Sequence, residues 1–445
     1  MELAKYAFFW GCQIPARLPF MEKSTRLALD RLAVGYTDLA GFTCCPEKSL
    51  VKNFNKEQWL LTAARNLSLA ERAGLDLITA CNGCYSTLKS AHMQLRTDHE
   101  LKKRVNYFLQ QVGLAYQGAL KVKHLVELLH DEVGPGKIRS YVRKPFSGMR
   151  IASHPGCHML RPSSVIRFDD PLKPAKLDAL VEALGAHSVD YQLKMTCCGG
   201  ALSHAGEEED SLALTRKKLL ELQKMRVDAM VLLCPACFIQ YDQKQYLAQR
   251  RGERLNIPVF TYPELLGLAL GLKREELGLE SHRVATGDFL ARWEQNLDRF
   301  GEVKQYLDLP AVRRCFECGA CVADCPVAET TDSFKPRELI GRLLEGKIEE
   351  LLQSKEPWYC VECHTCYELC PQKFGMEKVF GVLKRLAWER GLVPASIKGG
   401  IGTFLKTGRL GEPDEKNRKK LGLEPLPSGG AEDWQKLLEI CHKQE

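Results

Sequence analysis

Ten cysteines in the first half of the chain form two groups of five with closely matching spacing. The first pentad is Cys12, Cys44, Cys45, Cys81 and Cys84, and the second is Cys157, Cys197, Cys198, Cys234 and Cys237. In both pentads, 35 residues separate an adjacent cysteine pair from a Cys-x-x-Cys pair. Two adjacent cysteines can present two thiolates to one inorganic centre. The repeated spacing therefore predicts an internal duplication with one metal or iron–sulfur site in each half.

The number of sulfurs in each pentad limits which kinds of metal centre it could hold. A structural zinc ion takes four ligands, and a conventional [4Fe–4S] cube is also held by four cysteines. Five thiolates therefore favour an iron–sulfur centre that is not a simple cube, with one sulfur bridging two irons. The alternative is that one cysteine of each adjacent pair is only a small buried hydrophobic residue.

Eight further cysteines form two runs near the C-terminus, each followed by a proline. The runs are Cys315, Cys318, Cys321 and Cys325, and Cys360, Cys363, Cys366 and Cys370. The spacing is that of ferredoxins with two [4Fe–4S] clusters, in which the fourth cysteine of each run serves the other cluster. We therefore expect Cys370 to join the first three cysteines of the first run, and Cys325 to join those of the second. Zinc is the alternative, but the tight spacing before a proline, present twice, argues against it.

Composition excludes several classes of protein. The chain has 445 residues, which suggests about three domains at ~150 residues each. It contains no run of ~18 apolar residues that could span a membrane. The apolar patch at its N-terminus is too short and too aromatic for a secretory signal. Nineteen cysteines in a chain with an ordinary core indicate metal ligation in a reducing cytoplasm rather than disulfides. The net charge of +7 is only mildly basic, and nucleic acid is not an expected partner.

The elements that must position the pentads alternate between strands and helices. Apolar runs predict strands at 5–10, 75–80, 149–153, 188–193 and 228–233, and helical periodicity predicts helices at 20–34, 56–73, 176–184 and 207–226. Each cysteine then falls near the carboxyl end of a strand or the start of a helix. Ligands collect at that edge of an open α/β sheet, and helix N-termini there stabilise anionic thiolates.

The chain divides at changes of this pattern. Gly134-Pro135-Gly136 and the basic segment after it indicate a linker. We expect a first cysteine-rich domain at 1–146, a second at 147–282, a helical ferredoxin-like domain at 283–400, and a C-terminal tail at 401–445. The stretch after Leu392, with its two glycine pairs, is typical of mobile structure. The predicted fold class is α/β for two lobes related by a pseudo-twofold axis, followed by an all-α domain. That domain begins with a helix at 289–307, and another helix beginning near Pro336 separates its two cysteine runs.

The two pentads resemble the paired cysteine-rich (CCG) domains of the B-type subunit of heterodisulfide reductase, and the C-terminal part resembles the C-type subunit of the same enzyme. The resemblance covers residues 1 to about 400, and all ten pentad cysteines match. It implies a noncubane [4Fe–4S] cluster on each pentad, which makes these ten cysteines the catalytic ligands. It also implies two cubane [4Fe–4S] clusters on the eight C-terminal cysteines. One departure is Pro46, where the second pair is followed by Gly199. Because proline lacks an N–H, the first cluster should have one donor fewer.

The resemblance implies a cytoplasmic oxidoreductase of anaerobic metabolism that acts on sulfur groups. A disulfide, such as the coenzyme M–coenzyme B heterodisulfide or an analogue, would bind between the noncubane clusters and be cleaved to thiols. Electrons would come from a flavin-containing, electron-bifurcating A-type subunit and further input subunits, in a hetero-oligomer that could itself be dimeric. The alternatives are an electron-transfer module without its own substrate, quinone-linked electron delivery through a membrane partner, and a zinc-stabilised scaffold.

Three histidines lie near the second pentad. His154 and His158 flank Cys157, and His204 follows the glycine pair. Reducing a disulfide consumes two protons, and histidine titrates in the useful range. The other interpretation, which we prefer, is that these side chains hydrogen-bond loop backbone or cluster sulfurs.

Overall fold

A computed structural model of the chain describes residues 5–46, 51–298, 302–309, 311–312, 320–371, 374–411, 413–426 and 430–442. The chain divides into two compact units. The first comprises Met1–Gly301 with the short segments Asp308–Glu317 and Leu344–Gly346, and the second comprises the remaining segments up to Glu445.

Two parallel four-stranded sheets form the centre of the first unit, one in each half of the duplication. The first sheet has the order β2-β1-β3-β4, and the second has the matching order β6-β5-β7-β8. The strands of the first sheet are β1 (Tyr6–Phe8), β2 (Tyr36–Thr37), β3 (Asp76–Thr79) and β4 (Val122–His124). Those of the second are β5 (Arg150–Ser153), β6 (His187–Ser188), β7 (Ala229–Leu232) and β8 (Val259–Thr261). The identical topology confirms the predicted pair of duplicated α/β lobes.

The register of the central strands is also equivalent in the two lobes. In the first lobe, Tyr6 pairs with Asp76 and Phe8 with Ile78. In the second, Ile151 pairs with Ala229 and Ser153 with Val231. One residue beyond each first strand, the N–H of Phe9 donates to the carbonyl of Ile78, and that of His154 donates to the carbonyl of Val231, both at 2.7 Å. The two lobes can therefore be compared residue by residue.

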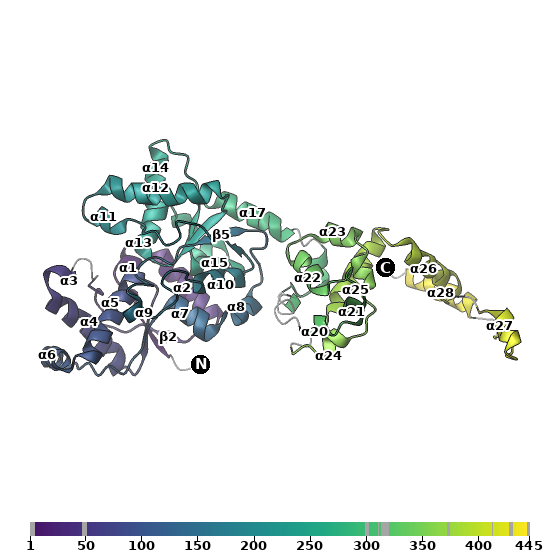
Figure 1. Ribbon diagram of the computed structural model, residues 1–445, viewed down its shortest axis with the longest axis horizontal. Coiled ribbons are helices and arrows are strands. Elements are labelled where there is room, and N and C mark those ends of the chain that lie inside the picture. Colours follow the sequence, from purple (N-terminus) through teal and green to yellow (C-terminus); the bar gives the residue numbers. More distant parts are fainter. Residues whose placement is uncertain are drawn as a thin grey trace. The chain divides into compact units, whose positions relative to one another are not determined.

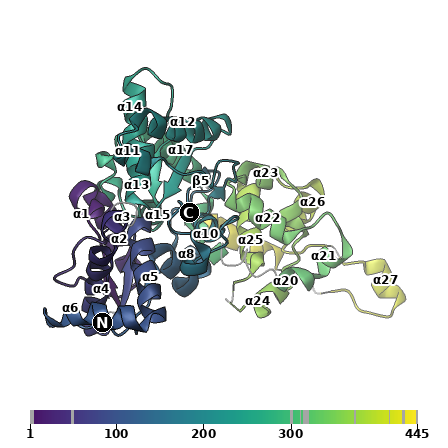
Figure 2. The same cartoon turned by 60° about the vertical axis from the view of Figure 1, so that its left-hand side comes forward.

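Helices cover both sheets (Figures 1 and 2). Those of the first lobe are α1 (Gln13–Arg17), α2 (Pro19–Arg31), α3 (Val51–Phe54), α4 (Lys56–Arg72), α5 (Asn82–Thr97), α6 (His99–Gln110), α7 (Leu125–Glu127) and α8 (Pro135–Tyr141), with a π-helix at Leu128–Val133. Those of the second are α9 (Ser163–Ile166), α10 (Lys176–Ala183), α11 (Gly200–His204), α12 (Glu208–Lys224), α13 (Pro235–Phe238), α14 (Gln245–Arg250), α15 (Tyr262–Ala269) and α16 (Arg274–Leu277), with a π-helix at Ile239–Lys244 and a 3₁₀ turn at Leu279–Ser281.

A long helix follows each adjacent cysteine pair, and its own sequence supplies the capping, apolar and charged residues that stabilise it. Helix α4 begins at the cap residue Asn55, whose side chain accepts the N–H of Gln58, and a cap of this kind contributes about 1 kcal/mol. One face of α4 buries Trp59, Ala63 and Leu67. Helix α12 carries three acidic residues in its first turn. Their negative charges interact favourably with the positive end of the helix dipole and so stabilise the helix.

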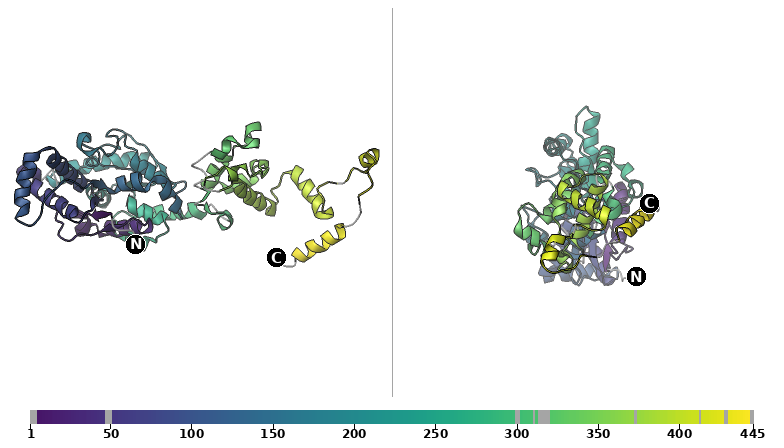
Figure 3. Two further views of the ribbon diagram at one scale, coloured as in Figure 1. Left: turned by 90° about the horizontal axis from the view of Figure 1, so that it is seen from below. Right: turned by 90° about the vertical axis from the view of Figure 1, so that its right-hand side faces the viewer.

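The two lobes share one hydrophobic core, which extends from Tyr6 to Trp293. Helix α2 of the first lobe packs against α15 and α16 of the second, and the purple-to-blue and teal lobes lie side by side in Figures 1 and 3. The following helix, α17 (Gly287–Asp298), packs on this core as well, because the Trp293 ring stacks on Phe146 and its indole N–H donates to the carbonyl of Pro145 at 2.8 Å.

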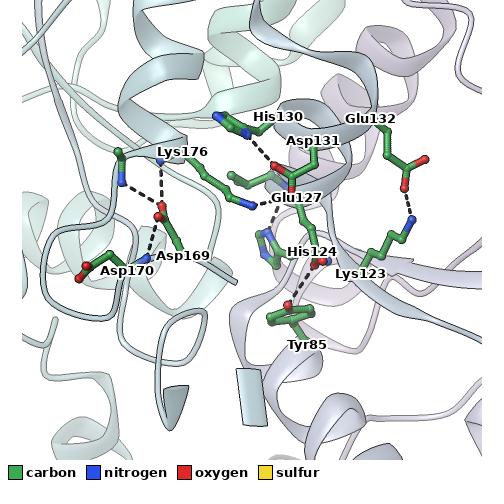
Figure 4. A network of polar contacts seen from close by, with 12 residues as sticks. Tyr85, Lys123, His124, Glu127, His130, Asp131, Glu132, Asp169, Asp170 and Lys176 are labelled. Atoms are coloured by element: carbon green, nitrogen blue, oxygen red, sulfur yellow. Dashed lines mark hydrogen bonds and ion pairs between the residues drawn. The ribbon is translucent and has the colours of Figure 1, made fainter. Parts of the chain in front are cut away.

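A polar network also joins the lobes (Figure 4). Lys176, at the start of α10, forms an ion pair with Asp131 in the π-helix of the first lobe. Asp169 accepts the N–H of Lys176 at 2.8 Å and so holds the start of α10. On the first-lobe side, the hydroxyl of Tyr85 donates to Glu127 at 3.0 Å. The start of α10 in the second lobe, with the loop before it, is therefore held against the first lobe.

The elements of the C-terminal part are helical throughout its described residues. They are α18 (Val303–Tyr306), α20 (Ala320–Ala323), α21 (Pro326–Thr330), α22 (Pro336–Leu344), α23 (Ile348–Gln353), α24 (Thr365–Glu368), α25 (Met376–Glu389), α26 (Ala395–Thr407), α27 (Glu415–Lys420) and α28 (Ala431–His442), with a 3₁₀ turn at Glu356–Tyr359. Among the residues that the structure describes, no helix has both the length and the apolar character needed to cross a membrane.

One predicted strand is shorter in the structure than expected, and two other predictions are only partly covered by it. The strand expected at 188–193 is only His187–Ser188, because the Glu221 carboxylate accepts the N–H groups of Gln192 and Leu193 at 2.7 and 2.9 Å and draws the backbone away from the sheet. The helix expected at 289–307 is described as α17 and α18, and its middle lies outside the described residues. The tail at 401–445 contains the end of α26 together with α27 and α28, and Phe404 packs on Trp434; its mobility stays a prediction.

Candidate active site between the two lobes

Four cysteines leave the two sheets at equivalent points. Cys12 lies four residues after β1 and Cys157 four residues after β5, whereas Cys81 and Cys234 lie two residues after β3 and β7. All four strands are parallel to their neighbours, so their carboxyl ends lie at the same edge of each sheet. The topology therefore brings these cysteines to the edge where open α/β sheets bind ligands.

Each Cys-x-x-Cys pair begins a helix. Cys81 is the N-cap residue of α5, and Cys84 lies in its first turn. Cys234 is the N-cap residue of α13, which continues through the π-helix into α14. Unpaired backbone N–H groups and the positive end of the helix dipole face these sulfurs, and both favour negative charge there.

The adjacent cysteine pair of the second pentad lies on a loop that requires glycine. Gly199, after Cys197 and Cys198, has a φ of 87°, and its N–H donates to the Cys197 Sγ over 3.4 Å. A Cβ at Gly199 would lie 2.9 Å from the Ser211 carbonyl oxygen. Pro46 occupies the corresponding position in the first lobe and has no N–H, so it cannot donate as Gly199 does.

All ten pentad cysteines line one cavity of about 300 Å³. The buried members are equivalent in the two lobes: Cys45, Cys81, Cys84, Cys198, Cys234 and Cys237. Both lobes contribute to the walls, which also include Trp10, Gln13, Val51, Asn82, His158 and His204. The cavity therefore presents two sets of five sulfurs to one volume of the size of a small-molecule site.

The lobes touch directly beside this cavity. The side chains of Cys81 and Cys234 interact across the lobe boundary. The amide nitrogen of Asn82 donates to the Pro155 carbonyl at 2.7 Å, while its oxygen is buried without a hydrogen-bond partner among the described residues. Asn82 lies between the cysteines of the first Cys-x-x-Cys pair, so this contact links one pentad to the loop that leads into the other.

Neighbouring thiols perturb one another strongly in both pentads. Hydrogen bonds from Cys44 and Cys84 lower the pKa of Cys45 to about 6. The Cys197 sulfur raises the pKa of Cys198 to about 12, and Cys237 holds the pKa of Cys234 well below its usual value. Each pentad thus combines thiolates with thiols in a buried space, and metal cations would neutralise that charge.

The residues present fit an iron–sulfur centre in each pentad. A Cβ at Gly11 would lie 2.7 Å from the Cys84 Sγ, so glycine at this position keeps the space beside that sulfur open. All ten pentad cysteines are free of disulfide bonds. Within the described part of the chain, no three cysteine, histidine or acidic side chains are arranged to hold a single ion. Each pentad nevertheless offers five sulfurs to the cavity, one more than a structural zinc ion takes.

The three histidines near the second pentad occupy different positions. His158 and His204 line the cavity. His154 is buried, its Nδ1 lies 3.0 Å from the Lys218 Nζ, and burial holds its pKa well below the usual value. His154 thus hydrogen-bonds Lys218, whereas the other two histidines are placed where a substrate could reach them. The preferred interpretation, a hydrogen bond to loop backbone or cluster sulfurs, stays a prediction.

A second group of cysteines surrounds a small cavity in the C-terminal unit. Cys325, Cys360, Cys363 and Cys366 line a space of about 30 Å³ with Glu377 and Phe380. These four are the set expected to share one cubane cluster. Cys370 is buried, Cys321 lies in α20, and Cys315 and Cys318 lie outside the described residues.

Sequence reasoning missed two residues beside the pentads. Lys218 is completely buried next to the second pentad, and burial lowers its pKa to about 8. Asn66 of α4 holds the first cysteine pair, since it accepts the N–H of Thr43 and donates to the Cys44 carbonyl. A signal for Asn66 was available, because a polar residue on the buried face of α4 is unusual.

Comparison with known proteins gives matches to both parts of the chain. Residues 6–89 and 151–242 each match the family of cysteine-rich domains, and residues 311–374 match the 4Fe-4S dicluster domain. The chain is 41% identical over 292 residues to the B subunit of the ferredoxin/F420H2-dependent CoB-CoM heterodisulfide reductase of Methanosarcina acetivorans, covering 65% of this chain and 97% of the relative.

Two further relatives extend this similarity. The 8-methylmenaquinol:fumarate reductase membrane anchor subunit of Wolinella succinogenes is 31% identical over 281 residues, which is 63% of this chain and 96% of that protein. The iron-sulfur C subunit of the CoB–CoM heterodisulfide reductase of Methanopyrus kandleri is 28% identical over 162 residues, covering 34% of this chain and 82% of the relative.

Proposed function

The chain belongs to the heterodisulfide reductase family, with a portion of the B type followed by a portion of the C type, and we propose that it reduces a disulfide in the cavity between its two lobes. It is an iron–sulfur oxidoreductase of the class that acts on sulfur groups. The observation that carries the proposal is the convergence of ten cysteines from two equivalent lobes on one cavity of about 300 Å³.

The pentads are assigned to two noncubane [4Fe–4S] clusters. An iron–sulfur cluster supplies electrons one at a time and offers iron as an acceptor for sulfur. Splitting a disulfide into two thiols consumes two electrons and two protons, and the two sulfurs need separate sites once their bond breaks. Five sulfur ligands on each side of one cavity provide for two such sites, one in each lobe.

The remaining wall residues bind and orient the disulfide. Trp10 and Val51 give an apolar surface that excludes water from the sulfurs. His158 and His204 can hold and transfer the protons that the product thiolates require. Beside them lies a more polar cavity of about 420 Å³, which shares Gln13, Gly200 and His204 with the first and adds Arg17. A polar or anionic substituent of the substrate would fit there.

The C-terminal part of the chain, from residue 283, is assigned to electron delivery, as an all-α ferredoxin-type domain with two cubane [4Fe–4S] clusters. One is held by Cys325, Cys360, Cys363 and Cys366, and the other by Cys315, Cys318, Cys321 and Cys370. The grouping of the first set around one cavity supports this division. The donor in this proposal is a flavin-containing, electron-bifurcating protein. The relatives are named as subunits, which supports a place for this chain in a hetero-oligomer.

One second candidate has a specific observation in its favour. The relative from Wolinella succinogenes is named as a subunit of a menaquinol-dependent reductase. By this likeness, the present chain would exchange electrons with a quinone through a membrane partner and would have no disulfide substrate of its own.

The test uses the anaerobically purified full chain. Iron and acid-labile sulfide are determined, and a reduced viologen dye is then offered with a panel of disulfides and with a quinone analogue. The proposal predicts about sixteen irons per chain, four per cluster, and dye oxidation that depends on a disulfide. About eight irons with two zinc ions would contradict the assignment of the pentads. Oxidation with the quinone analogue and with no disulfide would favour the second candidate.

A further inference from the structure

Lys218 makes the surroundings of the second pentad different from those of the first. Its side chain is completely buried. Its ammonium group contacts three acceptors, the Thr196 carbonyl at 2.7 Å, the Lys194 carbonyl at 3.1 Å and the His154 Nδ1 at 3.0 Å. Thr196 directly precedes the adjacent cysteine pair, so the cation is held at the backbone of the second pentad.

Lys218 forms no ion pair with a carboxylate among the described residues. Its hydrogen-bond partners are two carbonyls and a neutral imidazole. The rings of Tyr191 and Tyr241 lie 5.8 and 5.6 Å from its Nζ, and aromatic faces attract a cation without neutralising it. Lys194 nearby differs, because Asp178 lies 2.5 Å from its ammonium group. A buried cation without a paired carboxylate is costly, and anionic sulfur centres are what would offset that cost.

The first lobe has a neutral group at the corresponding place. Asn66 lies on α4 as Lys218 lies on α12, and both are completely buried. Asn66 donates to the Cys44 carbonyl at 3.1 Å and accepts the N–H of Thr43 at 3.0 Å. Thr43 precedes the first cysteine pair as Thr196 precedes the second. Both side chains thus hold the same loop, one as an amide and the other as an ammonium group.

The other neighbours of Lys218 are also replaced in the first lobe. Phe9 takes the place of His154, as the matching hydrogen bonds to Ile78 and Val231 show. Leu88 takes the place of Tyr241, since each lies seven residues after the first cysteine of its Cys-x-x-Cys pair. Phe9 and Leu88 are both fully buried. Two polar neighbours of the cation, His154 and Tyr241, are therefore replaced by apolar residues in the first lobe.

We propose that Lys218 sets the order in which the two pentad centres are reduced, by raising the reduction potential of the centre in the second lobe above that of its counterpart. This inference rests on the proposed function. Adding an electron to a centre adds negative charge, and a cation held in a buried, low-dielectric site favours that change. Hydrogen bonds to the sulfurs act in the same direction, and Gly199 supplies one that Pro46 cannot.

The consequence is an asymmetric reaction. Of the two electrons that reach the pentads from the external reductant, the first is held at the second lobe and the next at the first lobe. Both then pass to the disulfide, whose sulfur–sulfur bond breaks, and two protons complete the two thiols. The substrate sulfur beside the second pentad would therefore meet the more easily reduced centre.

The test is a redox titration of the iron-loaded full chain, followed by electron paramagnetic resonance. The signal of the second pentad is identified as the one lost in Cys198→Ser. In the unmodified protein, this signal should have the more positive potential. Lys218→Met should lower its reduction equilibrium constant at least about tenfold, which is about 59 mV for one electron. Lys218→Arg, which keeps the charge, should give a clearly smaller shift.

Lys217→Met is the matched control, because Lys217 is the neighbouring residue on α12 and is exposed. It should leave both potentials unchanged, and the first-pentad signal should move less than the second in Lys218→Met. A more positive potential at the first pentad in the unmodified protein would overturn the inference, even if Lys218→Met does not fold. So would equal shifts of both signals. A chain with only eight irons would instead refute the proposed function, so the two failures are distinguishable.

Discussion

Adding one methyl group at Gly156 tests the close approach of the two lobes beside the cavity. Gly156 has a φ of 78°, and a Cβ there would lie 2.5 Å from the Asn82 amide nitrogen. That nitrogen donates to the Pro155 carbonyl across the lobe boundary. Gly156→Ala therefore combines backbone strain with the displacement of an interlobe hydrogen bond.

The magnitude follows from these two contributions. An L-residue in the left-handed region costs roughly 1–2 kcal/mol, and a lost hydrogen bond that leaves a buried donor unpaired costs about 1–3 kcal/mol. Together, the free energy of unfolding should fall by about 2–5 kcal/mol. Gly74→Ala is the matched control, because Gly74 has a φ of 69° and a Cβ there meets nothing within 4 Å. It should show the backbone contribution alone, about 1–2 kcal/mol.

The assay is urea unfolding of the iron-loaded full chain under anaerobic conditions, followed by tryptophan fluorescence, with all variants measured in parallel. Asn82→Ala is added alone and in combination with Gly156→Ala. Because the clash is with the Asn82 side chain, the double variant should be more stable than the sum of the two single effects predicts. A Gly156→Ala cost no larger than that of Gly74→Ala, or strictly additive effects of Gly156→Ala and Asn82→Ala, would refute the reasoning.

Two further predictions concern electron delivery and pH. Removing residues 302–445 should abolish association with the proposed flavoprotein and leave the lobes unable to receive its electrons; co-purification of the truncated chain would contradict that assignment. The truncation keeps α17, which packs on the core of the first unit. Burial opposes a charge on His282, but Glu264 at 2.8 Å outweighs it and raises the pKa of this imidazole. The ion pair should therefore stabilise the fold fully below about pH 6.5, and its contribution should be lost as pH rises through the raised pKa of His282. His282→Gln should remove this pH dependence of the free energy of unfolding, measured in urea. An unchanged pH profile would refute the assignment.

The sequence predicted the elements whose signals are local. Apolar runs located the central strands, and β3 and β7 lie within the expected ranges. The parallel order of these strands then brings Cys12, Cys81, Cys157 and Cys234 to one edge of each sheet. Convergence of the ten cysteines on one space could therefore be anticipated from their spacing and from the duplication.

Features that depend on tertiary contacts could not be predicted. Lys218 lies in a run of charged residues on α12, where a lysine normally faces solvent. It is buried because His154, Tyr191 and Tyr241 pack around it. The link from Asn82 to Pro155 joins residues 73 positions apart. The short strand β6 results from the Glu221 carboxylate, which accepts the backbone N–H groups that would otherwise continue the sheet.

The most direct test of the central claim is turnover of a disulfide with an artificial reductant by Cys45→Ser and Cys198→Ser, the two equivalent buried cysteines of the adjacent pairs. Both variants should retain reducible ferredoxin-type clusters in the C-terminal unit. If each lobe provides a site for one sulfur of the substrate, both substitutions should cause an equally severe loss of turnover. Near-normal turnover in either variant would contradict the account, because one lobe would then suffice for the reaction.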